Sequence, residues 1–229
     1  MLDLAMALFL ALIAAGLGKR LLDWLGQAPE HPVDILALAT PIGLGVLALA
    51  TLLIGEAGWL NLVGLAVLLA VATELGVLAG ARLVRALVEN GKGWTSGAWR
   101  APLDRLLFVF LILVVGATAL ASLAPVTDGD ALCYHLQVPK VFLIHQRVFF
   151  DPDLHETVYP LVTELLYAIA LEFRGPVACR CLHWVLGLVF AANVAALARP
   201  SLGRRAWWAS AFTVLVPAIS NGMAAPLND

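Results

Sequence analysis

The chain has 229 residues, of which 62% are hydrophobic and 13% charged, and its formal net charge is −2. Soluble domains carry about 25% charged residues, so this composition, with a mean hydropathy of +0.91, excludes an ordinary soluble protein and indicates an integral membrane protein. The sequence has no basic patch interleaved with aromatic residues, which argues against nucleic acid as a partner.

Six apolar segments predict membrane-spanning helices, each of which needs about 20 apolar residues. They are, in chain order, Leu4–Leu17, Val33–Ile54, Trp59–Leu78, Leu106–Leu123, Cys181–Leu197 and Ala206–Ile219. The first has Asp3 before it and Lys19 and Arg20 after it, the reverse of a signal peptide, so we expect a retained span whose N-terminus lies outside. The predicted fold class is all-α: a polytopic transmembrane helical bundle of about six spans with short exoplasmic juxtamembrane helices.

The distribution of Lys and Arg predicts which connections face the cytoplasm, because cytoplasmic loops are enriched in both. Five basic residues lie between the third and fourth spans: Arg82, Arg85, Lys92, Arg100 and Arg105. That connection is therefore predicted to be cytoplasmic, and the fourth span delivers Asp128 and Asp130 to the exoplasmic face. In this orientation ten of the fourteen Lys and Arg residues are cytoplasmic, and ten of the sixteen Asp and Glu residues are exoplasmic.

The segment Tyr159–Phe173 is apolar but is predicted not to cross the membrane. It has only fifteen residues and contains Glu164 and Glu172, whereas a span needs about 17 residues or more. If it crossed, the basic turn at residues 199–205 would face outward, against the charge rule. We therefore interpret this segment as an amphipathic or re-entrant helix at the outer interface.

Ionisable residues are concentrated in residues 125–140, PVTDGDALCYHLQVPK, which directly follow the fourth span. Ionisable groups gathered at a membrane surface favour a functional site. Asp128 and Asp130 form a DxD pattern that can hold a divalent cation such as Mg²⁺ or Mn²⁺, although Asp-Gly-Asp is also a common turn and helix cap. We predict that Asp130 is a functional carboxylate and that Tyr134 and His135 belong to the site; Asp128 is either a second site carboxylate or a cap.

Several other polar residues of the exoplasmic region admit two interpretations. Lys140 is a candidate for binding a phosphate at the membrane surface, or a side chain that reaches toward the lipid headgroups. His155 and Glu156 lie in a loop, where polar residues are ordinary but function is also concentrated. His145 and His183 are expected to be interfacial or packed side chains.

From Pro125 onward the sequence resembles the C-type membrane glycosyltransferases (GT-C fold), in particular the bacterial relatives of protein mannosyltransferases and of lipid A aminoarabinose transferases. A span followed by DGDALCYHLQVPKVFL is similar to the family's first exoplasmic loop, which bears an acidic motif. YPLVTELLYAIALEF, which begins at Tyr159, is similar to the family's short interfacial helix, and residues 181–220 are similar to its helical hairpin with a basic turn. The final APLND, which ends in Asp229, resembles the start of a second acidic loop.

The resemblance implies transfer of a sugar from a polyprenyl-phosphate donor to an acceptor (a glycan, lipid or protein) at the exoplasmic face of a bacterial inner membrane. Asp130 is then the general base on the acceptor hydroxyl, a role that contributes about 10²–10⁴-fold to a rate. Tyr134 and His135 orient the base or the acceptor, and Lys140 offsets the phosphate charge. The further substrate-binding candidates are His155, Glu156, Tyr159 and Asp229.

The sequence divides into residues 1–105, the N-terminal spans and basic cytoplasmic connection, and residues 106–229, the GT-C-like module. Family members have many more spans, so we expect the module to be incomplete and the chain to be the N-terminal portion of a longer transferase. The alternatives are a non-enzymatic multi-pass protein, such as a transporter component or scaffold, and an inactive truncated transferase. A transporter predicts ionisable residues along a path inside the spans, whereas here they concentrate in one loop, which favours an enzyme.

Overall fold

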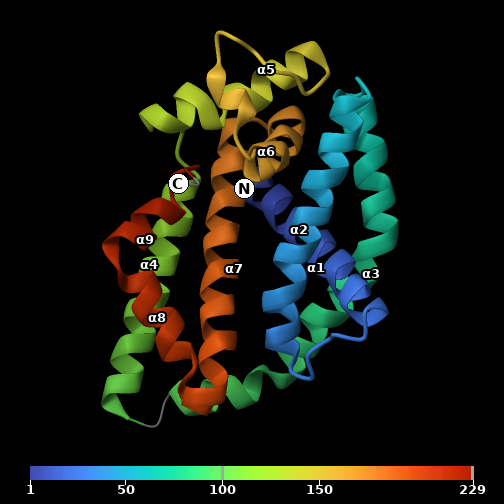
Figure 1. The fold of residues 1–229 in the computed structure, drawn as a ribbon. Helices are drawn as coiled ribbons and strands as arrows, with labels where there is room; N and C mark the ends of the chain where they lie inside the picture. The colour runs from blue at the N-terminus through green and yellow to red at the C-terminus, as the bar shows by residue number, and fades with distance from the viewer. Residues whose placement is uncertain (99–100, 228–229) are drawn as a thin grey trace.

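The computed structural model describes residues 1–98 and 101–227, and this part of the chain is helical with no β-strand (Figure 1). Its α-helices are α1 (Leu2–Trp24), α2 (Pro32–Glu56), α3 (Leu62–Ala98), α4 (Pro102–Ser122), α5 (Gln137–His145), α6 (Val162–Phe173), α7 (Pro176–Leu202), α8 (Trp207–Leu215) and α9 (Pro217–Met223). A π-helix, η1 (Ala131–His135), and two 3₁₀ turns, η2 (His155–Val158) and η3 (Gly203–Arg205), complete the secondary structure of the described residues.

Five helices, α1, α2, α3, α4 and α7, are long and apolar enough to cross a membrane, which confirms the predicted all-α, multi-pass architecture. The sixth predicted span, Ala206–Ile219, corresponds instead to two short helices, α8 and α9. They are separated at Val216, whose backbone is extended (φ −67°, ψ 122°), as expected for a residue that precedes a proline. Pro217 takes the first position of α9, where its missing N–H is not needed.

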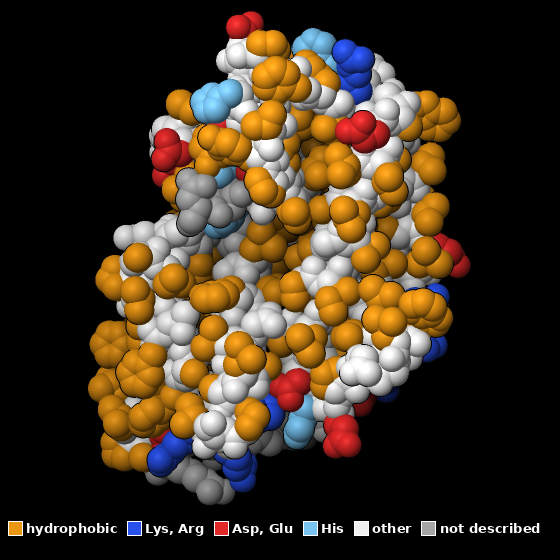
Figure 2. Space-filling model, viewed as in Figure 1, with side chains coloured by type: hydrophobic (Ala, Val, Ile, Leu, Met, Phe, Trp, Pro, Cys, Tyr) orange, Lys and Arg blue, Asp and Glu red, His pale blue; other side chains and the backbone are white. Residues whose placement is uncertain are grey.

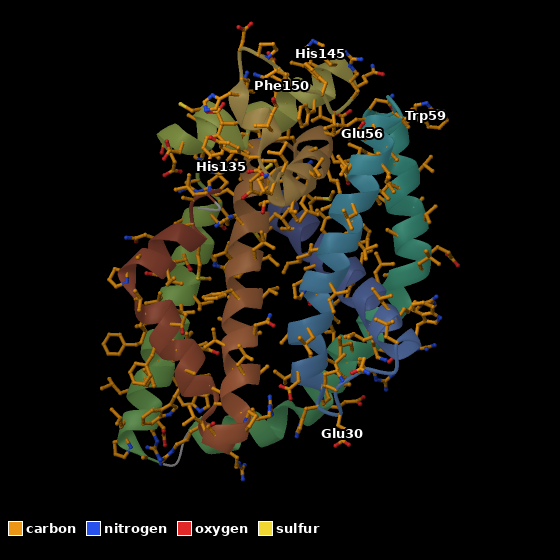
Figure 3. The ribbon with its side chains drawn as sticks, viewed as in Figure 1. Glu30, Glu56, Trp59, His135, His145 and Phe150 are labelled. Atoms are coloured by element: carbon orange, nitrogen blue, oxygen red, sulfur yellow. The ribbon has the colours of Figure 1, made fainter. Side chains whose placement is uncertain are left out.

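The two ends of the bundle carry different segments. One end, here called the loop end, carries α5, α6 and the α2–α3 turn, and Trp59 and His145 mark it in Figure 3. The opposite end, here called the basic end, carries the α1–α2 turn, marked by Glu30, together with the start of α4 and the α7–α8 turn (Figures 1 and 3). Hydrophobic side chains cover most of the flank between the two ends, and charged side chains gather mainly near the ends (Figure 2).

Polar contacts tie the helices together at the basic end. The guanidinium Nε of Arg199, in the last turns of α7, donates to Oδ1 of Asp34, in the first turn of α2, at 3.0 Å. The indole Nε1 of Trp208 on α8 donates to Oδ1 of Asp104, in the first turn of α4, at 2.9 Å. Asp104 is buried, so its carboxylate has lost its hydration, and this hydrogen bond offsets part of the free energy lost by desolvation.

Glycine allows the N-terminal helices to approach closely. A Cβ atom on Gly43 of α2 would overlap the backbone carbonyl of Ala14 on α1, and one on Gly16 of α1 would overlap the backbone carbonyl of Gly76 on α3. Helix association in a membrane depends on close packing of this kind, because lipid tails provide no hydrophobic driving force. Helix α1 therefore lies against both α2 and α3, and its residues Leu10, Ile13 and Ala14 are fully buried.

The basic connection between the third and fourth spans is largely a continuation of α3. The helix extends to Ala98, so Arg82, Arg85 and Lys92 are helical rather than part of a loop. The sequence from residue 79 to residue 90 contains no proline and is rich in Ala, Leu, Arg and Glu, which are good helix formers. Arg85 adds an ion pair with Glu89 one turn later, at 2.8 Å.

Helix α6 does not have the length to cross a membrane. Its 12 residues extend over about 18 Å at 1.5 Å per residue, well short of a hydrocarbon core of about 30 Å. It begins at Val162, after Pro160, and its residues from Glu164 to Ala170 are all buried. The segment Tyr159–Phe173 is therefore a short packed helix at the loop end, beside α2, α5 and α7.

The segment that follows α4 forms two helical pieces, η1 and α5, with the break at Leu136. Pro139 lies in the first turn of α5, where a missing N–H leaves no hydrogen bond unmade. The far end of α5 is fixed to the α2–α3 turn, because Leu60 N donates to the carbonyl of Gln146 at 2.9 Å and Val148 N donates to that of Gly55 at 3.2 Å.

The close contact between α1 and α2 gives a direct test of the packing. We expect Gly43→Ala to destabilise the protein by about 1–3 kcal/mol, because the added methyl group meets the backbone of Ala14. The matched control is Gly45→Ala on the same helix, where a Cβ meets nothing within 4 Å and the change should be neutral or stabilising by up to about 1 kcal/mol. Thermal unfolding midpoints in detergent measure both; equal effects would contradict the packing.

Cysteine accessibility tests the predicted orientation with a native reporter. Cys133 is exposed at the loop end, whereas Cys179 and Cys181 are buried. In intact cells or sealed vesicles of known orientation, a membrane-impermeant maleimide added outside should label Cys133. The same reagent should not reach Leu202→Cys, placed at the basic end in a Cys133→Ser background. Labelling of position 202 from outside would show that the predicted orientation is reversed or that α6 crosses the membrane.

Candidate functional site

The predicted acidic loop begins a helical segment at the loop end. The backbone carbonyl of Asp128 accepts a hydrogen bond from Leu132 N at 3.1 Å, and Asp130 directly precedes η1. Asp130 is exposed, whereas Asp128 is partly buried and its Oδ2 atom makes no hydrogen bond among the described residues. Asp130 is therefore the carboxylate of the pair that a solvent-borne or membrane-surface substrate can reach.

The π-helix η1 closes with a hydrogen bond from Leu136 N to the carbonyl of Ala131, five residues earlier, at 2.9 Å. Single π-helical turns are uncommon and are frequently found at functional sites. Asp130 precedes this turn and His135 is its last residue. Ala131 and His135 are both fully buried, so one side of η1 is fixed on the bundle while Asp130 faces outward.

A buried hydrogen bond links η1 to α6. Nδ1 of His135 lies 2.8 Å from Oε1 of Glu164, and both side chains are almost completely shielded from solvent. Because an ionised carboxylate can only accept, His135 is assigned the tautomer or charge state in which Nδ1 carries the hydrogen. His135 thus lies beneath the surface that Asp130 presents, and its imidazole reaches toward the bundle (Figure 3).

Aromatic rings extend from His135 to the surface. The ring of Tyr134 lies 3.7 Å from that of His135, centroid to centroid, and 6.3 Å from that of Tyr159, edge to face. Tyr159 in turn meets His155 edge to face at 6.0 Å. The structure therefore brings four of the predicted site residues, Tyr134, His135, His155 and Tyr159, into one group.

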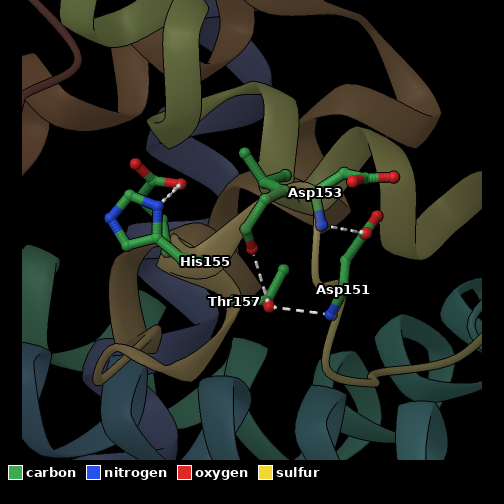
Figure 4. A network of polar contacts seen from close by, with 6 residues as sticks. Asp151, Asp153, His155 and Thr157 are labelled. Atoms are coloured by element: carbon green, nitrogen blue, oxygen red, sulfur yellow. Dashed lines mark hydrogen bonds and ion pairs between the residues drawn. The ribbon is translucent and has the colours of Figure 1, made fainter.

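The loop that carries His155 is held by its own hydrogen bonds (Figure 4). The hydroxyl of Thr157 accepts from Asp151 N at 3.0 Å and donates to the carbonyl of Leu154 at 2.9 Å. His155 is exposed and pairs with Glu156, with Nδ1 3.4 Å from Oε2. These contacts give the loop a defined shape and place the His155–Glu156 pair at the surface.

A second buried hydrogen bond joins α6 to α7. The hydroxyl oxygen of Tyr167 lies 2.8 Å from Nδ1 of His183. Burial, together with the nearby Cys179 and Glu164, raises the pKa of the Tyr167 hydroxyl well above its ordinary value, so the hydroxyl stays protonated and donates this hydrogen bond. Glu164 and Tyr167 are three residues apart and lie on the same side of α6.

Lys140 and Asp229 are not placed with this group. Lys140 lies on the exposed side of α5, opposite the buried Val138, Pro139 and Phe142. Asp229 lies outside the described residues. The described chain nevertheless ends close to the acidic loop, because Arg180 donates to the carbonyl of Ala224, after α9, and to that of Pro125, after α4.

The described residues do not form a complete cation site. No three or more His, Cys, Asp and Glu side chains come together among them in an arrangement that could hold a metal. Asp128 has one buried oxygen, whereas Asp130 is exposed. We therefore assign no chemical step to a cation, and a metal requirement stays a prediction from the DxD pattern.

Sequence reasoning missed the residues that form the hydrogen bonds between α6 and its neighbours beneath the site. Glu164 was used only as evidence against a span, Tyr167 was given no role, and His183 was expected to be packed or interfacial. One available signal was the spacing of Glu164 and Tyr167, two polar groups three residues apart in an otherwise apolar segment. Buried polar groups require partners, and here those partners are the two histidines.

Comparisons of the chain with models of protein families, with curated proteins and with solved structures find no match. The likeness to C-type glycosyltransferases therefore stays a prediction from the sequence. The structure is a helical bundle in which five helices are long and apolar enough to cross a membrane. At one end, the exposed Asp130 precedes η1, whose last residue, His135, makes a buried hydrogen bond to Glu164.

Removal of the Tyr167 hydroxyl tests the hydrogen bond between Tyr167 and His183. We expect Tyr167→Phe to destabilise the protein by about 1–3 kcal/mol, because it leaves the partly buried His183 without this partner. Tyr159→Phe is the matched control, since Tyr159 is 47% exposed and its hydroxyl can bond to water. Unfolding midpoints should differ clearly between the two variants; an unchanged midpoint for Tyr167→Phe would show that the bond contributes nothing.

Proposed function

We propose that the chain belongs to a membrane glycosyltransferase that moves a sugar from a polyprenyl-phosphate donor to an acceptor at the exoplasmic face. The observation that best supports the proposal is the exposed Asp130 carboxylate, which follows α4 on a helical turn whose opposite side is buried. A general base must be reachable by the acceptor, and the exposed Asp130 meets this condition.

In the proposed reaction the acceptor hydroxyl oxygen attacks the anomeric carbon while the bond from that carbon to the phosphate oxygen breaks. Asp130 takes the hydroxyl proton, and polyprenyl phosphate leaves with the electron pair of the broken bond. Tyr134 and Tyr159 present aromatic rings beside the acidic turn, on which a sugar ring can pack. Since His135 is fully buried, it acts by holding Tyr134 and η1 rather than by touching the acceptor. Lys140 is the proposed cation for the phosphate.

The charges of the described spans support a surface site over a transport path. The two ion pairs that link spans to other elements lie at the ends of the bundle: Arg199 with Asp34 at the basic end and Arg174 with Asp3 at the loop end. Glu74 is exposed on α3 rather than directed toward the other spans. A transporter would instead be expected to place ionisable side chains along an interior path.

Substitution of Asp130 tests the proposed function. In a preparation of the protein that transfers sugar from a polyprenyl-phosphate donor, Asp130→Asn should lower kcat by about 10²–10⁴-fold, because the amide keeps the shape of the side chain but cannot take the proton. Asp153→Asn, an exposed carboxylate in the same region, is the matched control and should have little effect. Near-normal turnover of Asp130→Asn would refute the assigned base, and absence of transfer by the parent protein with any such donor would refute the function.

A further inference from the structure

The buried face of α6 has polar groups that the proposed chemistry does not use. Glu164 is 2% exposed and lies in the first turn of a helix whose next six residues, Leu165 to Ala170, are all buried. Placing a carboxylate in such surroundings is costly unless a strong partner compensates. Its hydrogen bond to Nδ1 of His135, at 2.8 Å, is such a partner.

We propose that Glu164 is the positioning residue of the outer site: by accepting the Nδ1–H of His135 it holds η1, and with it Asp130, in place on the membrane bundle. The bond joins residues 29 apart in the sequence and connects the segment after α4 to α6. It acts at the end of η1 opposite Asp130, where His135 is the last residue of the π-helical turn.

Hydrogen bonds also attach the segment on either side of His135. The far end of α5 is tied to the α2–α3 turn through Gln146 and Val148. The chain just before Asp128 is tied to α7, because Arg180 donates to the carbonyl of Pro125. Between these two attachments, His135 provides the side-chain hydrogen bond to α6, and Tyr134 packs against the same imidazole. Without the acceptor on Glu164, we expect η1 to detach from α6.

Glu164 contributes one carboxylate oxygen, Oε1, to the contact with His135. The Oε1 atom acts as a hydrogen-bond acceptor, so glutamine, which keeps an acceptor oxygen at the same place, should largely replace glutamate. Leucine has a similar volume but no acceptor and leaves the imidazole N–H buried without its partner, which costs about 1–3 kcal/mol, or roughly five- to 150-fold in an opening equilibrium.

Thiol labelling measures the attachment of η1 without any reference to activity. Ala131 is fully buried on η1, so Ala131→Cys in a Cys133→Ser background reports opening of this turn. With the full chain in detergent or nanodiscs, Glu164→Leu should raise the labelling rate at position 131 by at least about fivefold. Glu164→Gln should stay within about threefold of the parent. Glu172→Leu, a partly exposed glutamate on the same helix, is the control and should not change the rate.

The role in catalysis rests on the proposed function and is measured separately. In the transfer assay Glu164→Leu should lower kcat at least about tenfold with KM within about twofold, and Glu164→Gln should restore kcat.

A labelling rate for Glu164→Leu equal to that of the parent would overturn the proposal, and a Gln variant no better than Leu would exclude the hydrogen bond as the cause. If the full-length protein that contains this chain transfers no sugar, the proposed function fails, but labelling still decides whether Glu164 holds η1. Val138→Cys, also fully buried, replaces Ala131→Cys if that variant does not fold.

Discussion

A polar, ionisable segment can remain on the end of an apolar helical bundle only if buried contacts hold it there. In this protein the hydrogen bond between His135 and Glu164 is the contact on which that arrangement depends most. It joins the segment after α4 to α6, and both of its side chains are shielded from solvent. An isolated charge in such a place costs several kcal/mol, so the two groups must be satisfied together.

Helix α6 can hold this contact in place because α6 itself packs tightly within the bundle. It is too short to cross a membrane, and it packs against α2, α5 and α7 instead. One side of α6 carries Glu164 toward η1 and Tyr167 toward His183 on α7. These two hydrogen bonds fix the rotation of the helix about its axis, which a purely apolar face would leave less well defined. Through these bonds, α6 connects the segment after α4 to the spans.

Much of this architecture could be predicted because it follows from length and hydropathy. The five long spans are clear from their apolar runs, and the non-crossing helix was indicated by fifteen residues that include Glu164 and Glu172. The division of the sixth segment into α8 and α9 was missed because hydropathy does not register the backbone restriction that Pro217 places on Val216. The continuation of α3 to Ala98 was missed because charge was taken as evidence of a loop.

The candidate site could be predicted only where its residues are neighbours in the sequence. Asp130, Tyr134 and His135 lie within six residues, and their clustering was visible directly. The partner of His135 lies 29 residues away on another helix, and no local pattern indicates which carboxylate a histidine will meet. That His135 is buried beneath the site was likewise invisible, because burial depends on the packing of α6 against η1.

A double-mutant cycle between His135 and Glu164 tests the central claim most directly, because it isolates the energy of their contact from the other effects of each substitution. The free energy of unfolding in detergent would be measured for the parent, His135→Leu, Glu164→Leu and the double variant. If the buried hydrogen bond holds the loop on the bundle, the two substitutions should be coupled by about 1–3 kcal/mol, with the second costing much less once the first is present. Effects that add to within about 0.5 kcal/mol would contradict the account.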